Sequence, residues 1–182
     1  LPDVSTNCYR VLDTAVDVLR SGFDGVITDV TSVNSFDFTV DQLGGDHAVE
    51  AGDVRGFPPQ DFPALRVVLV GVEYNDVAGV QGLTDAIVTF AVRCYVQSWE
   101  TPTGSPEPTT IAASERLAAL YVGIIRRVIE RDLTPANGAT GVYDLHTVGA
   151  DFPEPFSQDR RTGQVCEVTF EALQRQRRSH FT

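Results

Sequence analysis

The sequence contains no lysine and no methionine, and its three cysteines form neither an even set nor a C-x-x-C pair. An odd number without that spacing argues against a disulfide framework. Cys94 and Cys166 lie on the apolar faces of expected strands. We therefore expect buried, reduced thiols that act as small hydrophobic side chains in a protein that folds in a reducing compartment.

Further absences exclude classes of function. No apolar run approaches the roughly 20 residues that a membrane helix needs, so we expect no membrane partner. The formal net charge of −11 disfavours a general nucleic-acid binder, because such proteins are normally basic. The phosphate-binding motifs G-x-x-x-x-G-K-[ST] and G-x-G-x-x-G do not occur, nor does the nucleophile motif G-x-S-x-G. The sequence thus assigns no catalytic residue and no cofactor.

Two local clusters offer weak chemistry. Asp144 and His146 occupy alternate positions of one expected strand, where a carboxylate can orient a histidine base, although such a pair is more often an exposed strand face. An acidic group with the oxygen ligands that Ca²⁺ prefers surrounds Gly44 and Gly45. Its members are Asp41, Asp46, His47, Glu50 and Asp53. The spacing of a calcium loop is missing, so a solvated acidic loop is the favoured interpretation and no metal is expected.

The clearest pattern in the chain is an alternation over residues 83–99, which predicts a long half-buried antiparallel strand. One face carries Val88, Phe90, Val92, Cys94 and Val96. The other face carries Thr89, Ala91, Arg93, Tyr95 and Gln97. This second face is too mixed for bulk solvent alone, so we expect a neighbouring subunit to cover part of it.

Three more segments have strand patterns, at residues 65–74, 142–148 and 164–174. The first is nearly all apolar, which predicts a central position in its sheet. Its hairpin connection to the long strand carries turn residues. Residues 159–163 read as a turn before the last strand, and the basic tail from residue 175 to 182 is expected to fray.

Two amphipathic helices are expected. The first covers residues 8–20, with Gly22 as its stop. The second is capped by Thr109 or Thr110 and runs to about residue 131. Between the first helix and the Pro-rich stretch 57–63 the pattern loosens. We expect an irregular excursion over residues 23–63, with short β-like runs at 26–30 and 36–40.

The order of these elements predicts an α+β fold in one domain spanning residues 1–182. Two layers are expected: a mainly antiparallel sheet of four or slightly more strands, and two helices on one face of it. Long loops protrude from this core.

Loops that leave a compact sheet commonly carry its contacts. The expected arms are the hairpin at residues 75–82 and the loops at 100–110 and 151–157. An arginine cluster at the C-terminus is either a solvated tail or a contact with an acidic surface or nucleic acid. The candidate subunit or partner contacts are Asn75, Asp76, Trp99, Glu100, Phe152, Phe156, Arg160, Arg161, Arg175, Arg177 and Arg178.

The layout resembles the tail terminator, or tail completion, proteins of long-tailed bacteriophages. The shared features are an N-terminal amphipathic helix, a proline-introduced strand at 62–67 in a hairpin with the strand that ends at 95–98, a long helix at 114–131, and two closing strands. The last strand, at 165–170, follows Asp159-Arg160-Arg161-Thr162-Gly163. The excursion at 23–63 is longer than the family requires.

The resemblance implies a structural virion protein, not an enzyme. Such a protein forms a hexameric ring that caps the tail tube, stops its polymerisation and joins the tail to the neck. The implied partners are identical subunits, the tail tube protein and a neck or head-completion protein. Genomic DNA would pass through the lumen without specific binding, which an acidic lumen helps. The implied location is the virion tail or neck, and the host cytoplasm during assembly.

Two alternatives stay open at this point. Other neck, head–tail joining and minor tail proteins share much of this layout. From a different class, a small cytoplasmic α+β enzyme would use Asp144 and His146.

Overall fold

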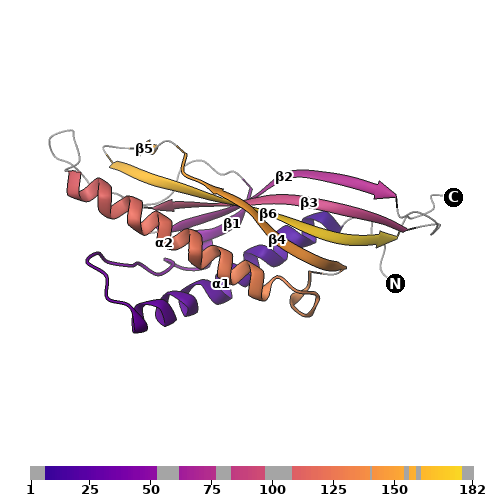
Figure 1. Ribbon diagram of the computed structural model, residues 1–182, viewed down its shortest axis with the longest axis horizontal. Coiled ribbons are helices and arrows are strands. Elements are labelled where there is room, and N and C mark those ends of the chain that lie inside the picture. The colour runs from indigo at the N-terminus through magenta and orange to yellow at the C-terminus, as the bar shows by residue number, and fades with distance from the viewer. Residues whose placement is uncertain are drawn as a thin grey trace.

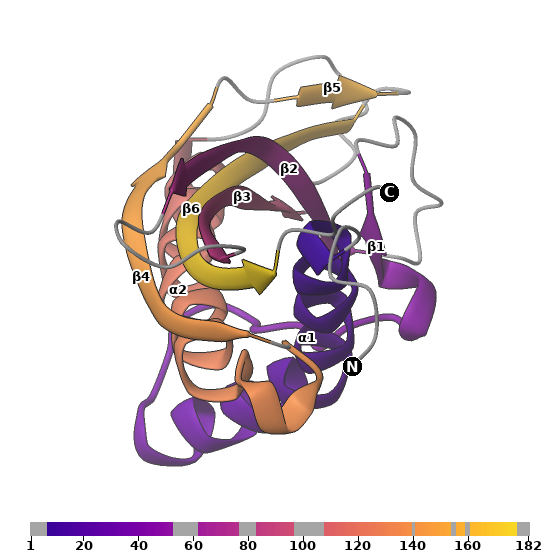
Figure 2. The same ribbon diagram turned by 90° about the vertical axis from the view of Figure 1, so that its right-hand side faces the viewer.

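The structure is a computed structural model, and it describes residues 7–52, 62–76, 83–96, 108–139, 141–153, 156–158 and 161–177 of the 182. Two long helices pack against one face of a strongly twisted sheet (Figures 1 and 2). The fold is therefore α+β with two layers, as the order of sequence patterns predicts.

The sheet has the strand order β1-β2-β3-β6-β4, and β5 pairs with β6 off this path. The strands are β1 (Val49–Ala51), β2 (Ala64–Asp76), β3 (Leu83–Val96), β4 (Val142–Asp151), β5 (Phe156–Gln158) and β6 (Arg161–Arg177). Among the strands of the described chain, only the β1–β2 pair is parallel. The prediction of a mainly antiparallel sheet of four or slightly more strands is confirmed.

β3 lies at the centre of the sheet and pairs with β2 on one side and β6 on the other. Its apolar positions, Phe90 among them, are fully buried beneath the helices, as the alternation predicts. Phe90 faces Phe170 of β6, and their rings stack with centroids 5.3 Å apart. Burial of this aromatic pair makes the middle of β3 and β6 the centre of the core.

The first helix is longer than predicted. α1 runs from Asn7 to Val33 and continues past Gly22. A Cβ added at Gly22 would lie 3.0 Å from Asp132 Oδ2 and 3.1 Å from Val128 Cγ1. Gly22 therefore allows α1 to approach α2 (Pro108–Asp132) closely, and it does not end the helix. The prediction of a stop at Gly22 is wrong.

The predicted β-like run at residues 26–30 is also helical, because this part of α1 packs against α2. Val26 and Ile27 are buried and extend the apolar stripe of α1 by a further turn after Phe23. Packing against α2 decides between strand and helix here, because a short apolar run fits either period. The second predicted helix, at 109–131, agrees with α2 within the usual uncertainty of helix ends.

The irregular segment begins after Val33 and contacts both helices. No strand forms at residues 36–40. Instead, Phe38, Val40 and Leu43 pack on the core. The Tyr121 hydroxyl of α2 donates a hydrogen bond to the Asp41 carbonyl at 2.8 Å. Side-chain packing and this bond hold the segment without strand pairing.

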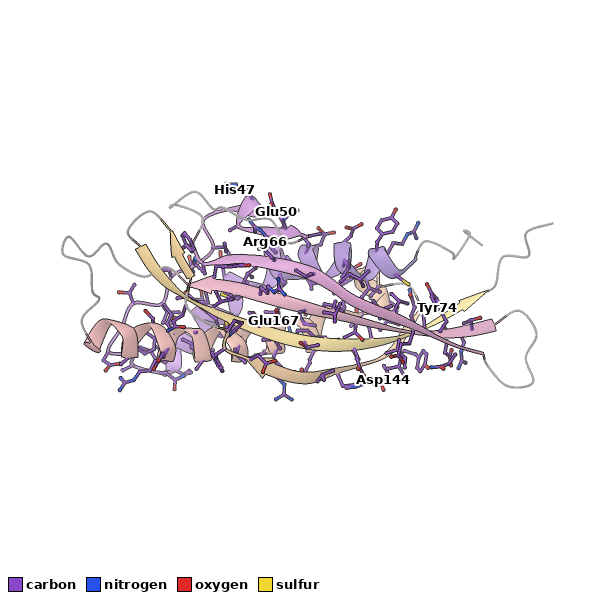
Figure 3. The ribbon with its side chains drawn as sticks, turned by 90° about the horizontal axis from the view of Figure 1, so that it is seen from above. His47, Glu50, Arg66, Tyr74, Asp144 and Glu167 are labelled. Carbon is purple, nitrogen blue, oxygen red and sulfur yellow. The ribbon has the colours of Figure 1, made fainter. Side chains whose placement is uncertain are left out.

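The segment then reaches the sheet through η2 (Asp46–Ala48) and β1. Arg66 of β2 is 3% exposed, and its Nη1 donates to the carbonyls of Ala48 at 3.2 Å and Leu65 at 2.8 Å. Its Nη2 lies 3.5 Å from Glu50 Oε2 (Figure 3). Its hydrogen bonds to backbone carbonyls and its ion pair with a partly exposed carboxylate stabilise this buried guanidinium. These contacts link β1 and the residue before it to β2.

The last strand is longer at both ends than predicted. Residues 161–163 of the predicted turn belong to β6 and pair with β5. Residues 175–177 of the predicted frayed tail continue β6 and pair with β3. Both ends of the last strand extend because a neighbouring strand satisfies their backbone groups.

Candidate assembly surfaces

One end of the sheet gathers residues that the sequence proposed as contacts. β2 ends there and β3 begins there, with Asn75 opposite Asp85 and Asp76 opposite Thr84. β6 ends beside them, where Arg177 pairs with Leu83. Asn75, Asp76, Arg175 and Arg177 thus share this part of the fold, which we call the hairpin end.

An ionic and aromatic cluster organises the hairpin end. Arg175 donates from Nε to Asp85 Oδ1 at 2.9 Å and from Nη2 to Asp85 Oδ2 at 3.3 Å. Tyr143 of β4 donates its hydroxyl hydrogen to Asp85 Oδ2 at 3.3 Å. The guanidinium carbon of Arg175 lies 5.3 Å from the centroid of the Tyr143 ring. Arg175 is therefore a fixed part of a three-strand surface, not a solvated tail charge.

These contacts change the acidity of Asp85. Hydrogen bonds from Arg175 hold the pKa of the Asp85 carboxyl below its usual range. A carboxyl whose pKa is lower in the folded state adds stability above its unfolded pKa. That stability is lost as pH falls through the folded pKa.

A pH series on Asp85→Asn tests this linkage. At pH 7 the variant is expected to melt at a lower temperature than the wild type. The difference should narrow progressively below about pH 4, where the Asp85 carboxyl of the unfolded wild-type chain becomes protonated before that of the folded chain. Thermal melts from pH 7 to pH 2.5 measure it. Glu115→Gln, at an exposed carboxylate of α2, is the matched control and should give a smaller difference at pH 7. If the difference in melting temperature between Asp85→Asn and the wild type stays constant with pH, the Asp85 carboxylate does not stabilise the folded chain in the way described.

The opposite end of the sheet holds a second group of candidates. Phe152 directly follows β4 and is 55% exposed. Phe156 lies in β5 opposite Gly163, and Arg161 begins β6 opposite Gln158. Arg175 lies fourteen positions after Arg161 along β6, which is about 46 Å of strand. Figure 1 shows β5 and the end of strand β6 at opposite ends of the molecule.

The predicted contacts that the structure describes therefore form two groups at opposite ends of the sheet. Trp99, Glu100, Arg160 and Arg178 lie outside the described residues, as does Gln97.

The face of the sheet away from the helices carries charged side chains that pair across strands. Arg93 of β3 forms an ion pair with Glu167 of β6. His146 Nε2 of β4 lies 3.1 Å from Glu171 Oε2. Asp144 accepts a hydrogen bond from the Leu145 amide at 3.0 Å and does not orient His146. Ala91 is already fully buried within the chain, so cross-strand pairs account for part of the mixed character of this face.

No group of three or more histidine, cysteine, aspartate or glutamate side chains is arranged to hold a metal ion within the described residues. Asp53, one member of the acidic group around Gly44, lies outside them. Among the helices described, none combines the length and apolarity that crossing a membrane requires.

The sequence interpretation missed the open edges of the sheet. β2 pairs with β1 only through residues 65–67, so within the described chain residues 68–76 form an edge. The prediction that this strand is central holds only for its first part. β4, whose one partner in the described chain is β6, forms the other edge.

Exposed apolar residues mark both edges. Val70 on β2 is 59% exposed, and Tyr143 and Val148 on β4 are each 53% exposed. Each of the three stands at a break in the pairing register. A bulge inserts one extra residue and re-aims its side chain, so a strict alternation in the sequence cannot locate it.

Comparison with known proteins adds little to this description. No family model matches the chain, and no curated protein matches it. One solved structure aligns with 86% of this chain and 94% of its own at 15% identity and a TM-score of 0.37. Similarity at that level carries no argument about fold or function.

Proposed function

We propose that the chain is a structural virion protein that assembles into a closed ring, most specifically the tail terminator of a long-tailed bacteriophage. The ring would cap the tail tube and join it to the neck. The observation that carries the proposal is the pair of open sheet edges, β2 and β4, on opposite sides of one subunit. The element order, which resembles that family, supplies the specific role.

Strand direction supports a head-to-tail ring. From one edge to the other, β2, β3, β6 and β4 alternate in direction. If neighbouring copies are related by rotation about an axis nearly parallel to the strands, each strand keeps its direction from copy to copy. β4 of one copy is then antiparallel to β2 of the next. Antiparallel neighbours exchange regular backbone hydrogen bonds, and heterologous contacts that close by rotation form rings.

The apolar edge residues and the two ends fit the same arrangement. Val70 on one edge, with Tyr143 and Val148 on the other, offers apolar side chains that a neighbouring edge would cover. The hairpin end and the opposite end of the sheet, where β5 lies, would face opposite openings of the ring. Different residues at each opening suit two different partners, a tail tube protein and a neck protein. The net charge of −11 suits a lumen through which DNA slides without binding.

The proposal predicts the size of the purified protein and the effect of edge charges. Native mass spectrometry and light scattering should give a ring near six copies. Val70→Lys and Val148→Lys should each yield monomers with unchanged circular dichroism, because a lysine on an edge strand opposes pairing with another edge. Val33→Lys is the matched control, since Val33 is 79% exposed at the end of α1, and it should leave the ring intact.

Each outcome decides something. A wild-type protein that stays monomeric at all concentrations would overturn the ring. Rings that persist in both edge variants would overturn the edge-to-edge geometry. Wild-type rings added to polymerising tail tube protein should shorten the tubes. A ring without that effect would replace the terminator role with that of another neck protein.

A further inference from the structure

Two of the three cysteines lie directly opposite each other in the core. Cys94 of β3 and Cys166 of β6 are antiparallel partners, and both are fully buried and free. We propose that they form a latent disulfide site. A disulfide bond between β3 and β6 would form when the chain refolds, or transiently unfolds, in the presence of a small-molecule disulfide. This inference does not depend on the proposed function.

The backbone geometry of the pair suits a disulfide. Directly opposed residues of antiparallel strands have Cα atoms about 4.5 or 5.5 Å apart, depending on the hydrogen-bonding position. Disulfides span Cα separations of about 4.4–6.8 Å. Either position in the ladder therefore lies within reach, and the bond requires no change in strand pairing.

The third cysteine is too remote to compete. Cys8 contacts the hydroxyl of Tyr74, with its Sγ 3.8 Å away. Tyr74 pairs with Ala86, eight residues from Cys94 along β3, or about 26 Å of strand. In the folded arrangement of one chain, Cys94 and Cys166 can be joined only to each other.

The reaction is two thiol–disulfide exchanges. The thiolate of one cysteine attacks the small disulfide, forms a mixed disulfide and releases one small thiol. The thiolate of the other cysteine then attacks the protein sulfur of the mixed disulfide, which forms the Cys94–Cys166 bond and releases a second small thiol. The two protons lost by the protein thiols end on the two small thiols, and the small disulfide is the oxidant that is reduced.

Burial determines when this reaction can occur. The pKa of Cys94 is raised by burial, with a further contribution from Cys166, so the reactive thiolate is scarce in the folded chain. A small disulfide also has no access to side chains that are fully buried. The folded protein therefore keeps its thiols reduced, and closure requires an opened or refolding chain.

The bond would join the two central strands. It would enclose residues 95–165, the stretch that carries α2, β4 and β5. A cross-link around so long a loop restricts the unfolded chain strongly, so the oxidised protein should resist denaturant better than the reduced one.

The test uses the full chain carrying Cys8→Ala. It is unfolded in urea, refolded in a glutathione disulfide and glutathione buffer, and digested without reduction. A peptide that links Cys94 to Cys166, lighter by two hydrogens, should be the main product, and this protein should unfold at a higher urea concentration than a sample refolded in dithiothreitol. The folded protein in the same buffer should oxidise at least about tenfold more slowly, because reaction follows opening.

Three results would overturn the proposal. They are glutathione adducts on single cysteines as the main product, links between chains, or an oxidised protein that unfolds at lower urea. Equal oxidation rates from folded and unfolded chains would overturn the protective role of burial. Cys94→Ala and Cys94→Val, each with Cys166 retained, are the matched controls and should show no rise in the urea midpoint after oxidation.

Discussion

Replacing Phe170 with alanine is expected to lower the free energy of unfolding by about 3–5 kcal/mol, the usual cost of removing a buried aromatic ring. Phe170 is fully buried, and its ring stacks on Phe90 with centroids 5.3 Å apart. Its strand, β6, pairs with β3, β4 and β5. The cavity would therefore lie beneath the strand that has the most partners in the sheet. The helices on this face cannot fill the space without leaving their own contacts.

Urea unfolding followed by circular dichroism measures the loss. Phe170→Leu keeps part of the volume and should cost less than the alanine variant. Phe152→Ala is the matched control, because Phe152 is 55% exposed beyond the end of β4. It should stay within about 0.5 kcal/mol of the wild type. Equal losses at Phe170 and Phe152 would contradict the placement of the core.

The contrast between the two phenylalanines also shows what the sequence can predict. Phe170 falls on the apolar face of a regular alternation, so its burial follows from the period of a strand. The same logic finds β3 and the two cysteines beneath the helices. Such predictions succeed because each depends only on neighbours along the chain, and the fold class follows from their order.

The errors share a cause that lies beyond those neighbours. Gly22 has the sequence signature of a helix stop, yet its missing side chain makes room for Val128 and Asp132 of α2. Strand β2 is apolar enough for a central strand, but β1 covers only its first part. Contacts between distant segments decide both cases, and a local pattern does not contain them.

The candidate surfaces show the same division. The sequence singled out Arg175 but not its partners Asp85 and Tyr143, which come from two other strands. Their meeting depends on the register of β6 against β3 and β4, including a bulge at Tyr143. Register follows from the assembled sheet, so this cluster becomes visible only with the strand pairing.

Gly141→Ala is expected to lower the free energy of unfolding by about 2–4 kcal/mol, because it adds backbone strain and a steric clash. Gly141 has φ +80°, and an added Cβ would lie 2.9 Å from the Arg175 carbonyl oxygen. The Gly141 carbonyl also accepts a hydrogen bond from the Arg175 amide at 3.0 Å. This contact holds the start of β4 against the end of β6, beside Tyr143.

Two other glycines separate the two effects. Gly138 has φ +102°, but a Cβ there would meet only Thr14 Oγ1, at 3.4 Å, so Gly138→Ala tests strain with little clash. Gly123 lies in α2 with open space around it, and Gly123→Ala should stabilise the protein by about 0.5–1 kcal/mol. Urea unfolding of all three variants should therefore give a lower free energy of unfolding for Gly141→Ala and a higher one for Gly123→Ala than for the wild type.

The Gly141 variant also bears on assembly. A Cβ that pushes β4 away from β6 should separate Tyr143 from Asp85 and Arg175, and so displace one edge of the sheet at the hairpin end. Under conditions where the variant is still folded, the proposed ring of Gly141→Ala should dissociate at a higher protein concentration than that of Gly138→Ala. If Gly141→Ala costs no more stability than Gly138→Ala, the close approach of β4 to β6 is not what fixes that edge.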